Sequence, residues 1–600
     1  MRVADYIIKT LTDKYNVKHI FLVTGGGAMH LNDAVGKNKK IKYICNHHEQ
    51  ASAMAAEGYS RISGKVGVTM VTSGPGGGNA VTGVMGAWLD SIPMLVLSGQ
   101  VKIETTILKA PGLRQLGDQE INITDIVRPI TKYSVMVTSS EDIRYHLERA
   151  MYLAEHGRPG PVWLDIPLDI QAAEIDPNNL REYNSDEDSL KSDLSSIKTV
   201  VKKLFQAKRP VIVAGNGIRL SGASDLFSSL VNKLKIPVLT SILGIDLIET
   251  DHPYFYGRPG ILGDRAANFI LQNSDCVLIL GARMGIRILG YNYKSFAREA
   301  YKIMVDIDSA ELSKPTLNID LPICSDASEF LQALNLKLQD QAISLREDWL
   351  NYCSKIKKKY PWVLDEHRKI EEAVSSYVFP EELSKNLLGD EIIVTANGTI
   401  YTSTFQSICL KKGNRMFSNQ ACASMGYGLP AAIGASFASN KKKSIICLTG
   451  DGSIQMNLQE LQTVLNYHLP IKIFMYNNNG YVSIKNTQKA FFDGNLVGSS
   501  PESGVILPNM LKLAEAYGFP IYKITNHNEL RKNLPAILAQ KGPLFCEIKT
   551  PPFEMLGPKA STMRLSNGQL VSRPLEDLAP LLPREEFLRN MIIPPFDKSK

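Results

Sequence analysis

Apolar runs of strand length alternate with helical stretches in three successive parts of this 600-residue chain, and this alternation limits the fold more than any other feature. Residues 444–450 (SIICLTG) and 471–476 (IKIFMY) are two such runs, and residues 457–465 between them show helical spacing of apolar side chains. A helix between two buried strands indicates a parallel pair with a crossover connection. Three such series predict the α/β class, with three doubly wound parallel-sheet domains.

The predicted domain boundaries follow changes in composition along the chain. The first domain is expected over residues 1–180, the second over 194–340 and the third over 370–550. A polar stretch at 176–193 reads as an exposed linker between the first two domains. Residues 551–600 are rich in proline and polar side chains, and we expect them to form a C-terminal tail that folds over the functional site as a lid.

Composition favours a soluble globular protein in a reducing compartment. Hydrophobic residues make up 44% and charged residues 21% of the chain, and the net charge of +7 is small for its length. The basic runs at 355–359 and 441–443 read as solvated surface rather than as nucleic-acid or lipid sites. No stretch approaches the roughly 20 apolar residues of a membrane span. The eight cysteines include no CxxC pair, so we expect reduced thiols and a cytoplasmic location.

Polar clusters follow two of the predicted strands at the point where each strand ends. Residues 450–453 read GDGS, and residues 477–479 are three asparagines, with Asn478 lying 27 positions after Asp451. The carboxyl ends of parallel strands share one edge of a sheet, which is where ligands bind. A carboxylate, an amide oxygen and a backbone carbonyl suit Mg²⁺ that also binds diphosphate oxygens and water. The alternative is an Asx turn at Asp451 and a plain polar loop at the asparagines.

A second motif supports the Mg²⁺ interpretation. Residues 41–84 read IKYICNHHEQASAMAAEGYSRISGKVGVTMVTSGPGGGNAVTGV. Together with the GDG…NN element, this stretch resembles the thiamine-diphosphate (ThDP) enzymes, and within them the acetolactate synthase group. The resemblance covers about residues 1–550. It implies ThDP and Mg²⁺ as cofactors, and a homodimer or tetramer with each site at a subunit interface.

The resemblance also implies roles for individual residues. Glu49 matches the glutamate that activates the cofactor by hydrogen bonding to its pyrimidine ring, although a lone glutamate at such a place is otherwise a surface or helix-capping residue. The other catalytic residues implied are Gly26 and Gln119. The metal ligands implied are Asp451, Asn478 and the carbonyl of Gly480. The cofactor-binding residues implied are Gly74, Gly76, Asn79, Thr399, Ala423, Met425, Gly450, Gly452, Ser453, Gly480 and Tyr481. Met425 on its own would read as a core methionine.

The central segment resembles the part of the acetolactate synthases that binds FAD. The matching stretches are AGNGI at 214–218, YGRPG at 256–260 and GARMGIR at 281–287. The FAD-binding residues implied are Gly215, Gly217, Gly257, Arg258, Gly281, Arg283, Arg287 and Asp306. The usual acid between the two arginines is absent, and Arg258-Pro259 replaces a histidine. An empty pocket or another nucleotide is therefore the alternative.

The reaction implied is carboligation, in which a 2-oxo acid such as pyruvate is decarboxylated and its acyl unit is joined to a second carbonyl. One departure from the family, at the substrate end, leaves the acceptor open: Asn486 or Thr487 stands where the synthases carry a tryptophan. The diphosphate segment also departs, because TANGTIY at 395–401 lacks the usual His-Gln pair. The acceptor is then either a second 2-oxo acid or a nucleotide-linked keto-deoxysugar. Simple 2-oxo acid decarboxylation and a non-catalytic binding role are the remaining alternatives.

Overall fold

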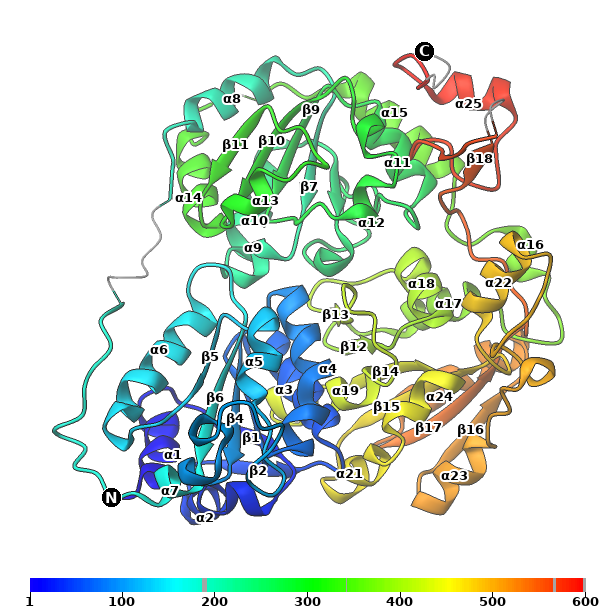
Figure 1. Cartoon of the computed structure of the whole chain (residues 1–600). Helices are drawn as coiled ribbons and strands as arrows, with labels where there is room; N and C mark the ends of the chain where they lie inside the picture. The colour runs from blue at the N-terminus through cyan, green and yellow to red at the C-terminus, as the bar shows by residue number, and fades with distance from the viewer. Residues whose placement is uncertain (186–191, 342, 565–567, 597–600) are drawn as a thin grey trace.

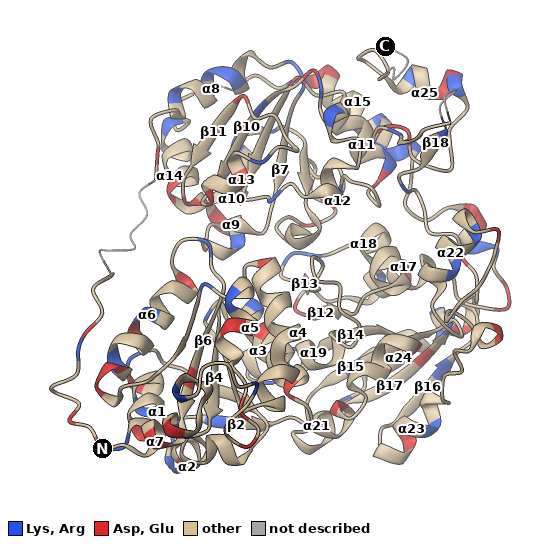
Figure 2. Ribbon diagram, in the orientation of Figure 1, with Lys and Arg blue, Asp and Glu red and all other residues tan. Residues whose placement is uncertain are grey.

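The computed structural model describes residues 1–185, 192–341, 343–564 and 568–596. Parts of the predicted linker (186–191) and of the predicted tail (565–567 and 597–600) lie outside the described residues. Three parallel sheets confirm the predicted fold class. In Figure 1 the first sheet lies lower left, the third lower right, and the second above both. Basic and acidic residues are interspersed along the ribbon of all three units (Figure 2).

The first sheet has six parallel strands in the order β2-β1-β3-β4-β6-β5. Its strands are β1 (His19–Leu22), β2 (Lys42–Cys45), β3 (Gly67–Val71), β4 (Met94–Gln100), β5 (Tyr133–Met136) and β6 (Pro161–Pro167). Its helices are α1 (Val3–Asp13), α2 (Met29–Lys37), α3 (Glu49–Ser63), α4 (Pro75–Asp90), α5 (Ile123–Val127), α6 (Ile143–Glu155) and α7 (Leu168–Ala172). β3, β4 and β6 are buried along their whole length, as continuous apolar runs in a covered parallel sheet require.

The second sheet has five parallel strands in the order β11-β10-β9-β7-β8. Its strands are β7 (Pro210–Ala214), β8 (Val238–Thr240), β9 (Cys276–Leu280), β10 (Tyr301–Asp306) and β11 (Leu321–Cys324). Its helices are α8 (Ile197–Gln206), α9 (Gly217–Leu220), α10 (Ser224–Leu234), α11 (Arg265–Gln272), α12 (Ile286–Leu289), α13 (Ser309–Leu312), α14 (Ala327–Lys337) and α15 (Glu347–Lys359). The chain leaves β7 for β8 on one side and later returns to β9 on the other, so the switch point of this sheet lies between β7 and β9.

The third sheet repeats the strand order of the first, as β13-β12-β14-β15-β17-β16. Its strands are β12 (Ile392–Thr395), β13 (Arg415–Phe417), β14 (Ile445–Gly450), β15 (Ile471–Asn477), β16 (Ile521–Ile524) and β17 (Leu544–Lys549). Its helices are α16 (Asp365–Arg368), α17 (Val378–Asn386), α18 (Thr399–Ser407), α19 (Gly428–Ala438), α20 (Asp451–Ile454), α21 (Glu460–Asn466), α22 (Val482–Phe491), α23 (Met510–Tyr517) and α24 (His527–Ala539). The two apolar runs quoted at 444–450 and 471–476 are β14 and β15.

The first residues of the tail contact the third domain, where Glu554 accepts a hydrogen bond from Ser375 Oγ at 2.6 Å, and the later described residues pack against the second domain. The described part of the tail contains the hairpin β18 (Thr562–Arg564) and β19 (Leu570–Ser572), and the helix α25 (Arg584–Asn590). Glu576 is buried and accepts hydrogen bonds from Gln272 on α11 (2.6 Å) and Arg298 (2.8 Å). Figure 1 shows this segment beside α11 and α15. These contacts anchor the tail, and its role as a lid stays a prediction.

Two helices from different domains pack in near backbone contact. A Cβ atom added to Gly434 of α19 would lie 1.9 Å from the carbonyl oxygen of Ala55 in α3, and one added to Gly58 would lie 2.4 Å from that of Ala431. Because only glycine permits so close an approach, these two residues lock the first domain onto the third. All eight cysteines of the chain are free. Among the described residues, no helix is both long and apolar enough to cross a membrane.

The α3–α19 contact yields a stability prediction. Gly434→Ala should destabilise the protein by about 1–3 kcal/mol, because the added methyl group overlaps backbone that cannot move independently. Gly36→Ala is the matched control, since Gly36 is also helical but its added Cβ meets no atom within 4 Å. We expect Gly434→Ala to lower the apparent midpoint of thermal unfolding by circular dichroism. Unchanged melting of Gly434→Ala would show that the helices can separate at little cost.

Candidate active site

The carboxyl ends of β1, β2 and β3 bring together residues predicted for the first half of the site. Glu49 is the first residue of α3, which follows β2, and its side chain is 9% exposed. Asn79 on α4 donates a hydrogen bond to Glu49 Oε2 at 3.0 Å. A Cβ atom on Gly76 would lie 3.6 Å from Glu49 Oε1. The second carboxylate oxygen of Glu49 therefore lies close to Gly76, which has no side chain to cover it.

Two further predicted residues lie at the same edge. Gly74 has a φ of +59°, and a Cβ atom there would lie 2.4 Å from the carbonyl oxygen of Gln119. The structure thus places Gln119, 45 positions further along the sequence, directly against the loop that follows β3. Gly26 belongs to the short 3-10 helix at 26–28 that follows β1, and a Cβ atom there would meet no atom of the described residues within 4 Å.

The turn after β14 joins the loop after β15 through the Asp451 carboxylate. Asp451 Oδ2 accepts hydrogen bonds from the backbone N–H groups of Asn478 (3.1 Å) and Gly480 (3.2 Å), and Oδ1 accepts one from Gly452 (2.8 Å). Burial raises the pKa of Asp451 to about 6, although these backbone hydrogen bonds act in the opposite direction. The three predicted metal ligands therefore lie together at one strand edge.

The oxygen atoms in this turn fit a divalent cation. Asn478 is 6% exposed, and its side-chain oxygen is buried with no hydrogen-bond partner among the residues that the structure describes. Buried polar atoms are rarely left unpaired, so such an oxygen beside a buried carboxylate suits an oxygen-seeking ion such as Mg²⁺. No cluster of three His, Cys, Asp or Glu side chains that could hold a metal occurs in the described part of the chain. A metal at Asp451 would thus rely on amide and carbonyl oxygens as well.

The remaining predicted cofactor-binding residues surround this turn. Gly426 N donates to Ser453 Oγ at 3.0 Å, which ties the segment before α19 to the turn after β14. The ring of Tyr481 lies over Gly452, where an added Cβ would come within 2.1 Å of Cε1. Met425 is 39% exposed, so it is not a core methionine. The other residues in this group are Ala423, with a φ of +55°, Gly450, at the end of β14, and Thr399, which begins α18.

Glu460 connects the two half-sites, and sequence reasoning missed it. It begins α21 and is fully buried. Its carboxylate accepts hydrogen bonds from Asn46 Nδ2 and the backbone N–H of His47, both at 2.8 Å. This carboxylate therefore holds the loop that leads into Glu49. The available signal was a charged residue at an apolar position of the helix QELQTVL, shortly after the GDG motif. His48 caps α3 through its Nδ1 atom, in keeping with a structural role.

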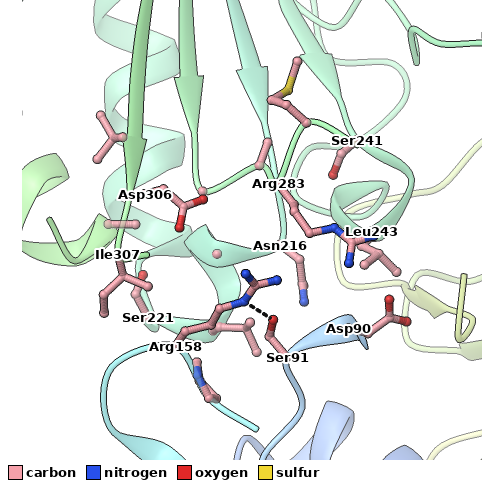
Figure 3. A pocket seen from close by; sticks show the side chains of 18 of the residues that line it. Asp90, Ser91, Arg158, Asn216, Ser221, Ser241, Leu243, Arg283, Asp306 and Ile307 are labelled. Atoms are coloured by element: carbon pink, nitrogen blue, oxygen red, sulfur yellow. Dashed lines mark hydrogen bonds between the residues drawn. The ribbon is translucent and has the colours of Figure 1, made fainter. Parts of the chain in front are cut away.

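A cavity of about 520 Å³ lies at the carboxyl edge of the second sheet, by the switch point between β7 and β9 (Figure 3). Its size is that of a small-molecule site. Five predicted FAD residues line it: Gly217, Gly281, Arg283, Arg287 and Asp306. Gly215 lies behind the lining, because a Cβ there would meet the Gly281 carbonyl oxygen at 2.2 Å. Burial raises the pKa of Asp306, which ends β10.

All three domains contribute to this cavity. Asp90, Ser91 and Arg158 come from the first domain, and residues 420–421 come from the third. Arg158 Nε donates to Ser91 Oγ at 2.8 Å (the dashed line in Figure 3) and Nη1 donates to Asp308 at 2.9 Å. Sequence reasoning did not select Asp90, Ser91 or Arg158, because their proximity to the second sheet depends on how the domains pack.

Gly257 and Arg258 lie apart from the 520 Å³ cavity. Arg258 is 2% exposed, and its Nη2 donates to the Ile408 carbonyl at 3.1 Å. Its Nε and Nη1 have no hydrogen-bond partner in the described part of the chain. Its guanidinium lies over the ring of Trp362 at 4.9 Å. The structure therefore gathers five of the eight predicted FAD residues and leaves Arg258 in a separate interior environment.

Comparison with known proteins agrees with this arrangement. The N-terminal TPP binding domain of thiamine pyrophosphate enzymes matches residues 1–124, the central domain of these enzymes matches 197–334, and their C-terminal TPP binding domain matches 396–548. The chain is 34% identical over 545 residues to the acetolactate synthase large subunit of Buchnera aphidicola subsp. Acyrthosiphon pisum, covering 90% of this chain and 92% of that one.

Two further relatives are similar over most of their length. The acetolactate synthase large subunit of Lactococcus lactis subsp. lactis is 35% identical over 557 residues, covering 91% of this chain and 92% of the relative. The isozyme 3 large subunit of Escherichia coli is 33% identical over 552 residues, covering 90% and 92%. The chain therefore belongs to the thiamine pyrophosphate enzymes, and it is a ThDP-dependent enzyme that resembles the acetolactate synthase large subunits.

Proposed function

We propose that this enzyme decarboxylates pyruvate and joins the resulting two-carbon unit to a second 2-oxo acid. The observation that carries the proposal is that the chain has both Glu49 and the Asp451 turn, each at the carboxyl edge of a parallel sheet. The same chain is about a third identical to an acetolactate synthase large subunit over nine tenths of its length. These relatives do not favour a keto-sugar acceptor or a simple decarboxylase.

The residues of the third domain would hold the cofactor's diphosphate and its metal. Asp451, Asn478 and the carbonyl of Gly480 would bind Mg²⁺, since one carboxylate and two neutral oxygens leave room for diphosphate oxygens. Gly452 and Ser453 would contribute backbone and hydroxyl hydrogen bonds to those oxygens. ThDP, when bound, supplies a carbon nucleophile and an electron sink for decarboxylation and ligation.

Glu49 would hold a proton at the cofactor's pyrimidine nitrogen. Asn79 fixes Glu49 Oε2 by its hydrogen bond at 3.0 Å, so Oε1 is the oxygen left to meet a ligand. The glycine at position 76 leaves that oxygen uncovered. Gln119 lies against Gly74 at the same edge, where it would contact the reacting end of the substrate. Each residue thus orients or moves a proton, or positions a ligand.

We propose FAD as the ligand of the 520 Å³ cavity. Support comes from the arginines at 283 and 287, which suit phosphate oxygens, and from the acidic Asp306 at the end of β10, which suits a ribose hydroxyl.

The FAD proposal predicts a selective loss in one variant. Arg283→Ala should weaken FAD binding about tenfold, because a charge-assisted hydrogen bond is lost. Flavin fluorescence titration of the purified protein measures this effect, and ThDP affinity of the same variant should stay unchanged. If the wild-type protein does not bind FAD at all, the FAD proposal fails, and an empty pocket or another nucleotide is the alternative.

The central prediction concerns turnover. Purified protein with ThDP, Mg²⁺ and carbon-labelled pyruvate should release labelled CO₂ and form labelled acetolactate, identified by mass spectrometry. Glu49→Gln should lower this rate by about 10²–10⁴-fold, because the amide cannot hold the proton that the carboxyl holds. Its ThDP affinity should stay close to that of the wild type, which serves as the control.

Two outcomes would contradict this scheme. Full turnover by Glu49→Gln would remove the assigned role of the carboxyl group. The protein could instead release label only when a keto-sugar nucleotide is added, and form no acetolactate from pyruvate alone. The acceptor would then be a sugar and not a second 2-oxo acid.

We also propose a homodimer, or a tetramer built of dimers, with each site formed by two chains. Support comes from exposed side chains at both half-sites: Leu113 and Leu116 are 53% and 45% exposed in the segment that leads to Gln119, and Met425 is 39% exposed. Apolar groups left uncovered beside a site indicate an interface.

Mixing two inactive variants tests this arrangement. Glu49→Gln contributes an intact Asp451, and Asp451→Asn contributes an intact Glu49, so a hybrid dimer contains one complete site. Statistical reassociation should restore about a quarter of wild-type activity, since half of the dimers are hybrids with one working site each. Native mass spectrometry would show whether hybrids form. If hybrids form and activity stays at the level of the separate variants, Glu49 and Asp451 of the same chain belong to one site.

A further inference from the structure

Glu120 closes a loop at the edge of the first sheet where the predicted site residues gather. It is 6% exposed. Its Oε1 accepts a hydrogen bond from the backbone N–H of Ile107, and its Oε2 accepts hydrogen bonds from those of Leu116 (2.9 Å) and Gly117 (3.1 Å). Residues 107 and 117 are the two ends of the loop, which we call its neck. The carboxylate of Glu120 therefore fastens the neck.

Backbone contacts close the same neck. The Glu120 N–H donates to the Gly117 carbonyl at 3.2 Å, and the Glu120 carbonyl accepts a hydrogen bond from Gln115 Nε2 at 3.1 Å. A Cβ atom on Gly117 would lie 2.7 Å from the carbonyl oxygen of Thr105, so the neck packs closely against the chain that enters the loop. The shape of the loop therefore depends on the residue that directly follows Gln119.

Gln119 itself has a constrained backbone. Its φ is +58°, a value that residues other than glycine rarely adopt, and its carbonyl oxygen lies against Gly74. On its other side, Gln100 Nε2 donates to the Ile121 carbonyl at 2.9 Å. Such a backbone persists only where the surrounding structure imposes it. The Gly74 contact and the hydrogen bonds of Glu120 are the constraints that act directly beside Gln119.

We propose that Glu120 is a positioning residue that sets the place of Gln119 in the reaction. This inference rests on the proposed function, because there Gln119 contacts the reacting end of the substrate. Glu120 acts through the backbone, since its carboxylate binds N–H groups of the loop. A catalytic side chain that is displaced by about 1 Å can lower a rate by about 100-fold, so the closure of the neck affects turnover.

A carboxylate suits this position because both of its oxygens accept hydrogen bonds. The amide of a glutamine accepts at one atom and donates at the other. Glu120→Gln would therefore turn an N–H group either toward the N–H of Ile107 or toward those of Leu116 and Gly117. Either orientation opens one side of the neck. Glu120→Asp keeps two accepting oxygens on a shorter side chain, so it should recover part of the lost function.

Glu104 provides a matched control in the segment that enters the loop. It is exposed and lies in the short 3-10 helix at 103–105. Glu104→Gln removes the same charge and makes the same chemical change, and it leaves the carboxylate that fastens the neck in place. An effect of Glu120→Gln that Glu104→Gln lacks cannot result from net charge alone.

The test is a double-mutant cycle, with rates of pyruvate turnover expressed per bound ThDP. Glu120→Gln should lower kcat/KM for pyruvate by about 10–100-fold, because Gln119 is displaced. In Gln119→Ala protein, the same substitution should cause less than about a twofold further loss, because the side chain that it would displace is already gone. Glu104→Gln should stay within about twofold of the wild type. The ThDP affinity of all variants, measured by calorimetry, should stay close to that of the wild type.

Hydrogen exchange gives a reading that does not depend on turnover. Peptides that cover residues 107–117 should exchange faster in Glu120→Gln, because backbone N–H groups of the neck lose their acceptor. Peptides from β14 and β15 should keep the wild-type rates, which shows that the protein remains folded. If Glu120→Gln does not fold, Gly117→Ala is the second variant. Its methyl group would meet the Thr105 carbonyl oxygen, so it should open the neck and lower kcat/KM with Glu120 intact.

The outcomes separate the inference from the proposed function. If the wild type does not turn over pyruvate with ThDP and Mg²⁺, the proposed function itself fails and the inference falls with it. If the wild type is active and Glu120→Gln is equally active although its loop exchanges faster, only the inference is overturned. Wild-type activity of Gln119→Ala would overturn it as well. So would equal losses from Glu120→Gln with and without Gln119, because Glu120 would then act on the fold as a whole.

Discussion

The backbone contact between α3 and α19 is the constraint on which both half-sites depend. Glu49 begins α3, and the segment with Ala423 and Met425 leads into α19. Glycines at 58 and 434 let the two helices meet at backbone distance, so any shift of one domain against the other moves the two half-sites of this chain relative to each other. Glu460 adds a polar link across the same junction, through Asn46 and the backbone of His47. The glutamate loop and the metal turn are therefore mechanically connected within one chain.

Buried charges extend this connection to the central domain. Arg61 on α3 pairs with Glu57 and with Asp90, and Asp90 also lines the 520 Å³ cavity. Asp246 in the second domain pairs with Arg219 (2.8 Å) and with Arg415 of the third. Breaking such a pair leaves an uncompensated charge away from water, which is strongly destabilising. The relative positions of the domains are therefore restricted by these contacts. The cavity exists because three domains are held at this junction.

Electrostatics divides the candidate site into two environments. At the edge of the first sheet, Glu49 shares its carboxylate with a neutral amide and an open glycine surface. At the edge of the third sheet, Asp451 is buried among backbone N–H groups. The first environment suits a Glu49 carboxyl group that holds a proton in a hydrogen bond to a ligand. The second suits a concentrated set of charges that only a bound metal and its anion would complete.

Local sequence determined the fold class and indicated the metal turn, whereas the glutamate half-site was implied by the resemblance to the ThDP enzymes. Continuous apolar runs require buried parallel strands, and polar residues just after such runs must lie at one sheet edge, so Asp451 and Asn478 could be paired across 27 positions. The tertiary structure alone decided which distant segments meet. Glu460, Arg158 and Asp90 act through domain packing, and periodicity contains no information on that. Arg258 matched a pattern, yet it lies outside the cavity that the pattern implied. Burial without a hydrogen-bond partner in the described part of the chain, as at Arg258 Nε, is likewise a property of three-dimensional surroundings, because a sequence lists charges but not the distances between them.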